Sequence, residues 1–513
     1  LQALANYRKT FFDKHTFDFL LGYESYEWNN EYTQAIGNNL YNPGSWAVNN
    51  TLNDDRRKGY GSYGAYSTRG YFGRINYDFD SKYFASFSYR RDGSSRFHPK
   101  NRWGNFYSVS AAWDIAHESF MMSTSEWLDQ LKLRASFGQQ GNDGIGNNYA
   151  YLDQFTISGA TEWSDGLLSY KGNPDLTWET SNAFNVGVDF SLWKGMLSDS
   201  AEFFNRQTSD MLYNKPVAPS LGYSSIPMNI GSMRNSGFEI ELNYRPVTTR
   251  NITWDINYNA TFVNNKILKL APELEGELIS GSRIYREGES MYQLYMVKYA
   301  GVDPATGRAL YWGKDAEGNE FPTTDWSVAY NGDTASGAQA NRCATGNLLP
   351  VVYGGFGTTL KVYGFDLAIA CSYQLGGKIF DSGYQEMMGT GTSGEYGRTF
   401  HKDILNAWTP ENPYTDVPRL DAEEAYPFFN YTTTRGLITS NYLAINNITL
   451  GYTLPSSVTK RIGIESIRVY GAADNLALWS ARKGLDPRQS YTSSTTSTYT
   501  AMRCISGGVK VVF

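Results

Sequence analysis

Hydrophobic and polar residues alternate with a period of two along most of the chain. The clearest segments are 131–137, 184–192, 238–244, 252–262 and 364–375. In 252–262, Ile256 shares its face with other apolar or aromatic residues, whereas Asn257 falls on the polar face. Because successive side chains of a strand point to opposite faces, the pattern predicts β-strands with one apolar and one polar face.

The predicted strands are long, about 9–13 residues in the clearest cases. Ordinary strands average about 5–6 residues, whereas a tilted strand that crosses a bilayer needs about 9–11. Aromatic residues stand near the ends of several strands, as Tyr71 and Tyr77 or Trp254 and Phe262 do. Such rings are typical of the girdles that border the apolar band of a membrane barrel. The sequence therefore predicts an all-β, transmembrane antiparallel β-barrel.

The connections alternate between short and long. Short ones lie at 80–82, 194–196, 245–251 and 361–364, and long ones at 25–68, 140–181, 208–235, 314–350, 377–440 and 478–505. Bacterial outer-membrane barrels have short periplasmic turns and long extracellular loops. We therefore expect about 17 strands, at 1–11, 16–24, 69–80, 82–91, 104–114, 129–139, 182–192, 197–207, 236–245, 252–264, 292–300, 308–313, 351–361, 364–376, 441–453, 467–477 and 506–513.

The parity of this count bears on the domain organisation. An odd number of strands, the first running towards the periplasm, does not suit a single-chain barrel, whereas a plugged transporter barrel has about 22 strands. Residue 1 is Leu, and no signal-peptide pattern follows it. We therefore expect residues 1–513 to be the C-terminal part of one 22-stranded barrel within a longer protein, with the plug and N-terminal domains outside this chain.

Composition excludes several other classes. Aromatic residues make up 15% of the 513 residues and charged residues only 19%, which does not suit a disordered chain. No apolar run is long enough for a transmembrane helix. A net charge of −6 gives no basic surface for nucleic acid. Three distant cysteines and four histidines indicate neither a disulfide framework nor a metal site.

Several short motifs are interpreted as structural elements and not as catalytic or binding sites. Residues 59–64 match GxGxxG, but a Gly/Tyr-rich loop leading into a strand lacks the βαβ context of a dinucleotide site. Asp92-Gly93 and residues 303–307 are interpreted as turns. Ser125 is expected to cap one helical turn over 125–129. Glu239 and Glu241 share a strand face that continues through Asn243, so we interpret them as lumen lining and not as an acid/base pair. The sequence predicts no catalytic, cofactor or metal residues.

The chain ends on an aromatic residue after an alternating segment, Val509-Lys510-Val511-Val512-Phe513. In an outer-membrane barrel, a terminal aromatic residue resembles the recognition signal for the assembly machinery. Phe513 is therefore the predicted barrel-assembly signal.

Short segments along the whole chain resemble one family, the SusC-like (SusC/RagA) TonB-dependent outer-membrane transporters of Bacteroidetes. They are residues 71–77, 90–97, 101–104, 108–113, 131–138, 173–179, 229–233, 235–239, 353–357, 470–476 and 484–487. The resemblance implies a plugged 22-stranded barrel, a SusD-like surface lipoprotein that caps it, and an inner-membrane TonB complex that supplies energy. The family's plug and TonB box have no counterpart in these residues.

These observations support one leading hypothesis, which is import of an oligomeric nutrient across the bacterial outer membrane by a protein that is not an enzyme. An oligosaccharide is the favoured substrate and an oligopeptide the alternative. Hypotheses of another class are a passive porin or adhesin barrel and a secreted carbohydrate-binding β protein. Trp46, Tyr60, Tyr63 and Trp163 lie in predicted loops, where they could bind substrate or pack. No substrate-binding residue is assigned.

Overall fold

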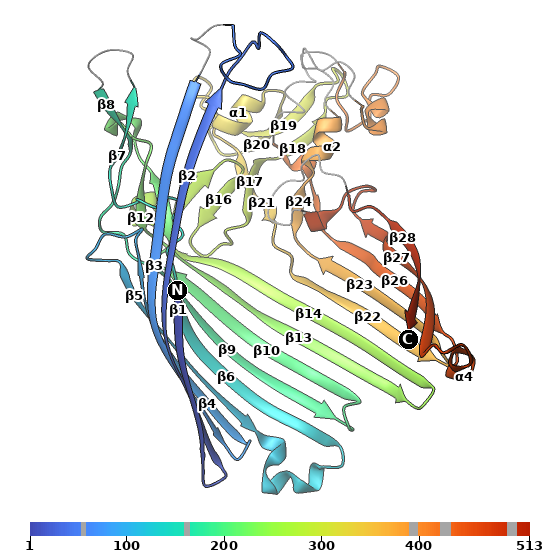
Figure 1. Ribbon diagram of the computed structural model, residues 1–513. Coiled ribbons are helices and arrows are strands. Elements are labelled where there is room, and N and C mark those ends of the chain that lie inside the picture. The colour runs from blue at the N-terminus through green and yellow to red at the C-terminus, as the bar shows by residue number, and fades with distance from the viewer. Residues whose placement is uncertain (53–57, 159–164, 389–398, 421–431, 490–499) are drawn as a thin grey trace. The chain divides into compact units, whose positions relative to one another are not determined.

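The computed structural model describes residues 1–52, 58–158, 165–388, 399–420, 432–489 and 500–513, and strands dominate it. Within those residues the largest sheet has 15 strands, each beside the next sheet strand along the chain (Figure 1). They are β1 (Gln2–Phe11), β2 (His15–Ile36), β3 (Lys58–Phe79), β4 (Tyr83–Ser94), β5 (Trp103–Asp114), β6 (Leu128–Asn142), β9 (Glu179–Leu192), β10 (Leu197–Ser209), β13 (Ser232–Thr248), β14 (Ile252–Lys269), β22 (Val352–Val362), β23 (Phe365–Leu375), β26 (Tyr442–Thr453), β27 (Ser466–Ser480) and β28 (Cys504–Val512).

The connections carry smaller elements. Five small sheets hold β7 (Gln154–Ser158) and β8 (Asp165–Tyr170); β11 (Leu212–Pro216) and β12 (Ser225–Asn229); β15 (Glu277–Ser280), β16 (Arg283–Arg286), β17 (Gln293–Val297) and β21 (Arg342–Asn347); β18 (Tyr299–Val302), β19 (Ala309–Lys314) and β20 (Glu320–Thr323); β24 (Lys378–Phe380) and β25 (Leu437–Thr439). The helices are η2 (Ile115–His117), η3 (Ser119–Thr124), η4 (Pro219–Leu221), η5 (Pro272–Leu274), α1 (Trp326–Asn331), α2 (Ser382–Met387), η6 (Lys402–Asn406), η7 (Thr434–Gly436), α4 (Ser456–Thr459), η8 (Lys460–Ile462) and η9 (Pro487–Gln489). In the part of the chain that is described, no helix is long and apolar enough to cross a bilayer.

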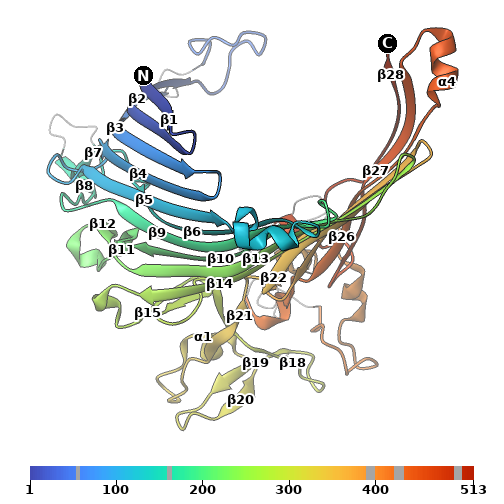
Figure 2. The same ribbon diagram turned by 90° about the horizontal axis from the view of Figure 1, so that it is seen from below.

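The chain forms two compact units. Unit 1 comprises residues 1–114, 133–185 and 206–232, and unit 2 comprises residues 115–132, 186–205 and 233–513. In unit 1, strands β1 to β5 pair antiparallel in chain order (Figure 2). In unit 2, β14, β22, β23, β26, β27 and β28 pair antiparallel in that order.

The apolar face of the large sheet is exposed. Leu21 is 67% exposed, Val109 49% and Leu450 55%, although each belongs to the apolar set of its strand. The buried apolar clusters lie instead among the connections, around Phe97, Val297 and Met388. A continuous exposed apolar surface marks a face that meets another apolar phase, and the length of these strands suits hydrocarbon.

Aromatic girdles border this apolar face in unit 1. At one level Tyr71 packs beside Trp103, with ring centroids 6.1 Å apart. At the other level Tyr83 stacks on Trp113 and packs against Phe79. Tyr71 and Phe79 share strand β3 and are eight residues apart, about 27 Å along a strand. At a strand tilt of about 35–45°, this separation corresponds to about 19–22 Å along the membrane normal, close to the height of an apolar band of about 25 Å.

The predicted strands at 292–300 and 308–313 are wrong as membrane crossings. They fall in β17, β18 and β19, which belong to small sheets outside the large one. Val297, Ala309 and Tyr311 are buried in one cluster with Ala329 of α1. The alternation there comes from packing within a connection, so the large sheet has 15 strands in the described residues and not the expected 17.

Strands β2 and β3 are much longer than predicted. Each has 22 residues, and they pair without a register shift from His15–Phe79 to Ile36–Lys58. Beyond Thr68, the last β3 residue that pairs with β4, they continue as a two-stranded ribbon (Figure 1). The GxGxxG match at 59–64 lies in this ribbon and not in a loop, and it opens no helix.

Two smaller predictions are also wrong. Asp92 and Gly93 lie inside β4, paired with Gly104 and Trp103, and the chain turns later. Ser125 follows η3 at its C-terminal end, where its hydroxyl donates to the Met122 carbonyl.

The predicted turn at 303–307 is confirmed. The Asp303 carboxylate accepts hydrogen bonds from the Thr306 hydroxyl and the Ala305 amide, and these bonds lower the pKa of Asp303.

Candidate functional site

The polar face of unit 1 carries a register-aligned row of hydrophilic side chains. Arg8, Asp18, Asn76, Ser86 and Ser110 occupy facing positions on the five successive strands β1 to β5. The Ser86 hydroxyl donates to the Asn76 amide oxygen over 2.7 Å. Since register fixes which side chains share a face, this row is a direct product of the period-two pattern.

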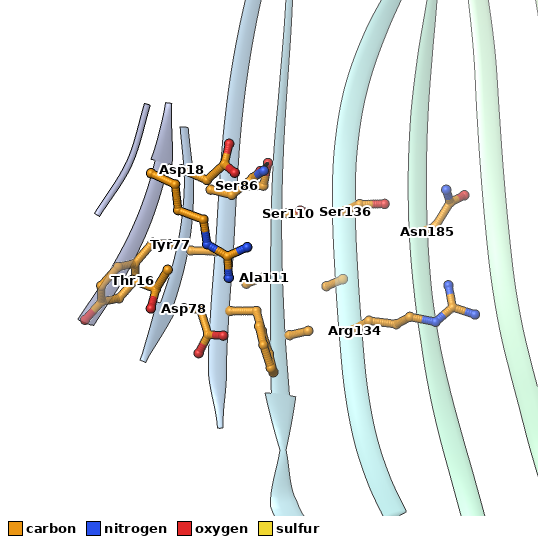
Figure 3. A pocket seen from close by; sticks show the side chains of 16 residues that line it. Thr16, Asp18, Tyr77, Asp78, Ser86, Ser110, Ala111, Arg134, Ser136 and Asn185 are labelled. Atoms are coloured by element: carbon orange, nitrogen blue, oxygen red, sulfur yellow. Dashed lines mark hydrogen bonds between the residues drawn. The ribbon is translucent and has the colours of Figure 1, made fainter. Parts of the chain in front are cut away.

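A hollow of about 500 Å³ lies along this row. Figure 3 shows Asp18, Ser86, Ser110, Ser136 and Asn185, from strands β2, β4, β5, β6 and β9, in a row along the hollow. Short serine and alanine side chains leave the space, and charged side chains border it. The hollow therefore offers an uneven polar wall suited to hydrogen bonding. Among the described residues no group of His, Cys, Asp or Glu could hold a metal ion.

Glycines make room for ion pairs on the polar face. In unit 1, Arg90 binds both Asp92 and Glu24, with nitrogen–oxygen distances of 2.7 and 3.0 Å. Gly70 lies between the two carboxylates in the register, and a Cβ there would approach Asp92 Oδ1 to 2.4 Å. Any larger residue at 70 would collide with this network.

Unit 2 contains the same arrangement of an ion pair beside a glycine, formed by different residues. Arg468 of β27 reaches Asp366 of β23 across β26, and its Nε donates to Asp366 Oδ1 over 2.9 Å. Gly451 is the β26 residue opposite Asp366, and a Cβ there would lie 2.5 Å from Arg468 Nη2 and 2.6 Å from Asp366 Oδ1. Both ion pairs hold long side chains flat against the polar face.

Residues 90–97, part of the recognised motif set, anchor a loop cluster in unit 1. Asp143, which follows β6, accepts hydrogen bonds from the Tyr66 and Ser94 hydroxyls over 2.7 and 2.6 Å. Arg96 binds the other oxygen of this carboxylate at 3.2 Å and lies 4.1 Å from the centroid of the Tyr66 ring. Phe97 is fully buried with Leu176 beneath this network.

The motifs at 173–179 and 229–233 bind each other. The Thr177 amide donates to the Asn229 side-chain oxygen, and the Asn229 side chain donates back to the Thr177 carbonyl. Glu179 accepts from the Leu212 amide, and Trp178 donates to the Arg102 carbonyl. The motifs that are separated in sequence therefore form one preformed loop cluster.

We expect Asp143→Asn to loosen this cluster. The carboxylate of Asp143 accepts hydrogen bonds from Tyr66, Ser94 and Arg96. The asparagine amide has only one acceptor oxygen, and its NH2 group would face one of these donors, so we expect the free energy of unfolding of the cluster to fall by about 1–3 kcal/mol. Amide hydrogen exchange over residues 143–150 should accelerate by roughly 5- to 100-fold. The matched control is Asp153→Asn, which breaks an exposed pair with Lys171 that solvent screens, so exchange over residues 143–150 should be unchanged. Unchanged exchange in Asp143→Asn would contradict this role.

The connections of unit 2 form a second cluster with buried ion pairs. Asp381 caps α2 by accepting from the Tyr384 amide and pairs with Arg482, whose guanidinium lies 3.3 Å from the centroid of the Tyr384 ring. Burial raises the pKa of Tyr384. Asp486 accepts three hydrogen bonds from Arg488, two from its guanidinium and one from its backbone amide, and Arg488 reaches Asn446 at a β-bulge of β26. These contacts fix the loops to the sheet.

The residues singled out from the sequence belong to several different elements. Phe513 follows β28 and is 89% exposed, and Trp46 is 94% exposed. Tyr60 and Tyr63 lie in β3, and Trp163 lies outside the described residues. Glu239 and Glu241 are exposed on β13, and Glu239 accepts a hydrogen bond from Thr261 of β14, consistent with a lining role.

The sequence did not reveal Asp143 and Asp381 as residues that hold the loops together. The residues next to each of them in the sequence do not distinguish it from a solvated loop carboxylate.

The long antiparallel strands, exposed apolar face and aromatic girdles define a class, the outer-membrane β-barrels. The chain belongs to the TonB dependent receptor-like, beta-barrel family, whose model matches residues 2–378. TonB-dependent receptor P3 of Formosa agariphila is 31% identical over 438 residues, 82% of this chain and 42% of that protein. TonB-dependent receptor SusC of Bacteroides thetaiotaomicron is 28% identical over 442 residues, again 82% and 42%.

A solved structure described as the RagAB peptide transporter is also similar. It has 28% sequence identity and a TM-score of 0.85, over 99% of this chain and 55% of that one. The chain thus spans about half the length of the relatives it matches. These findings confirm the resemblance to SusC-like proteins, the outer-membrane location and the barrel fold. The family consists of transporters, which confirms that the chain is not an enzyme.

Proposed function

We propose that residues 1–513 supply the C-terminal part of the barrel wall of an importer that moves an oligomeric nutrient across the outer membrane with energy from TonB. The observation that carries the proposal is family membership, together with a sheet whose apolar face meets lipid and whose polar face bears the row from Arg8 to Ser110. A SusD-like surface lipoprotein delivers the substrate, and TonB traction on a plug opens the path.

In this proposal the wall residues bind and do no chemistry. The ion pairs of Arg90 and Arg468 keep the polar face fixed, and the polar row offers donors and acceptors to a passing hydrophilic ligand. The proposed substrate is an oligosaccharide. An oligopeptide is the second candidate, because the similar RagAB structure is described as a peptide transporter.

Growth of the source bacterium tests this proposal. A strain without this gene should lose growth on one class of oligomer, and a strain without TonB should lose it equally. Growth on monomers should be unaffected in both strains. Oligomer uptake that survives loss of TonB would favour the passive porin hypothesis instead.

A further inference from the structure

The β2–β3 ribbon reverses the character of the two sheet faces. Up to Glu24 and Gly70, the polar face carries residues such as Asp18 and Asn76, and the opposite face carries apolar residues such as Leu21. Beyond this level, the continuation of the apolar face bears Glu27 and Glu31. The continuation of the polar face becomes aromatic instead. Water on both sides explains the charged face but not why rings gather on the other.

Four exposed rings lie on that aromatic face. They are Tyr26, Trp28, Tyr32 and Tyr60, and each is 41–50% exposed. Asn30, Gln34 and Ser62 stand between them on the same face and are also exposed. Along β2, the Tyr26 and Trp28 positions are about 7 Å apart, and Trp28 and Tyr32 about 14 Å apart. The face thus presents rings separated by neutral hydrogen-bonding groups.

The aromatic face is held in place from one end. The Tyr26 ring packs edge-on against Tyr66, with centroids 6.2 Å apart. Tyr66 is in turn fixed by Asp143 and Arg96 in the loop cluster. The Trp28 ring lies over Gly64, and its Cζ3 would be in van der Waals contact, at 3.4 Å, with a Cβ at that position. Rings that are ordered before a ligand arrives lose little entropy when they bind it.

We propose that this face binds a neutral oligosaccharide, an inference that rests on the proposed function and assigns it a substrate-contacting surface. Tyr and Trp present an apolar ring with a polar tip, which complements a sugar ring with C–H groups on its faces and hydroxyls at its edge. From residue 25 to 35 and from 59 to 68 the face carries no formal charge, while Glu27 and Glu31 occupy the other side. The charged groups near this face lie towards its ends, Lys58 at one end and Glu24 with the paired Asp143 and Arg96 at the other, so the rings between them complement a neutral ligand.

The test measures binding by the full-length protein in detergent to neutral gluco-, xylo-, manno- and galacto-oligosaccharides, with mixed-sequence peptides as a second arm. Trp28→Ala should weaken binding of the recognised oligosaccharide by roughly 5- to 10-fold, and Trp28→Phe should restore most of it. Tyr63→Ala is the matched control, because Tyr63 is 61% exposed on the opposite face of the same ribbon. It should bind like the wild type.

Several results would overturn the inference. They are a wild type that binds none of these oligosaccharides, equal losses in Trp28→Ala and Tyr63→Ala, a loss confined to the peptide arm, and a loss of the surface lipoprotein without a loss of sugar. Cellular uptake separates this inference from the proposed function. TonB-dependent sugar import that is unchanged in Trp28→Ala cells refutes the site alone, whereas absence of any TonB-dependent import in wild-type cells refutes the function.

Discussion

Ile256→Arg is expected to destabilise the folded protein in a bilayer by about 2–4 kcal/mol, the cost of a cation near the midplane on the lipid face. Ile256 lies on the face of β14 that also carries Trp254 and Tyr258, 39% and 37% exposed. Its register partner on β22 is Thr358. The side chain therefore meets hydrocarbon, where a guanidinium is poorly solvated.

Asn257→Arg is the matched control for this prediction. Asn257 lies on the polar face, opposite Gly357 on β22, where a Cβ would be 3.0 Å from the Asn257 side-chain oxygen. The glycine leaves space for a longer side chain in a wet environment, so the cost should stay within about 0.5 kcal/mol. Urea-dependent folding equilibria of both variants in lipid vesicles measure the difference. Equal free energies of unfolding would refute the assignment of faces.

Deletion of Phe513 is expected to reduce the amount of assembled barrel in the outer membrane several-fold while leaving the folded protein stable. Val509 and Val511 of β28 pair with Val469 and Ile467 on the apolar face, whereas Phe513 lies beyond the strand and is 89% exposed. An exposed terminal ring contributes little packing energy. Its proposed role is recognition by the assembly machinery, so its loss should affect insertion and not stability.

Heat-modifiable migration and surface labelling of cells measure this effect. Lys510→Ala serves as the control. Lys510 lies on the polar face of β28, the strand that precedes Phe513, opposite Arg468 of β27 in the register. The control should assemble at the wild-type level. Wild-type surface levels after deletion of Phe513 would show that this residue is not the signal.

The sequence predicted the membrane strands well, because a sheet between lipid and a wet lumen imposes a strict period of two. The same rule does not operate where both faces meet water. Residues 58–66 of β3 are rich in Gly and Tyr and show no apolar alternation, so the ribbon resembled a loop. In 292–313 the period was genuine, but its apolar residues pack against α1.

The loop clusters could not be predicted in the same way. Asp143 gains its role from Tyr66, Ser94 and Arg96, residues that lie 47–77 positions away in the chain. Gly70 and Gly451 differ from other glycines only through side chains on neighbouring strands. The recognised motifs indicated where such contacts form, and the three-dimensional register shows what each residue does.

Uptake of oligomers by intact cells is the decisive measurement of TonB-driven import by this protein. The comparison is between wild-type cells, cells without this gene, and cells with the gene but without TonB. We expect one oligomer class to enter wild-type cells only, and we expect restoration of the gene to restore entry. Equal uptake in all three strains would contradict the claim that the chain forms the wall of a TonB-driven importer.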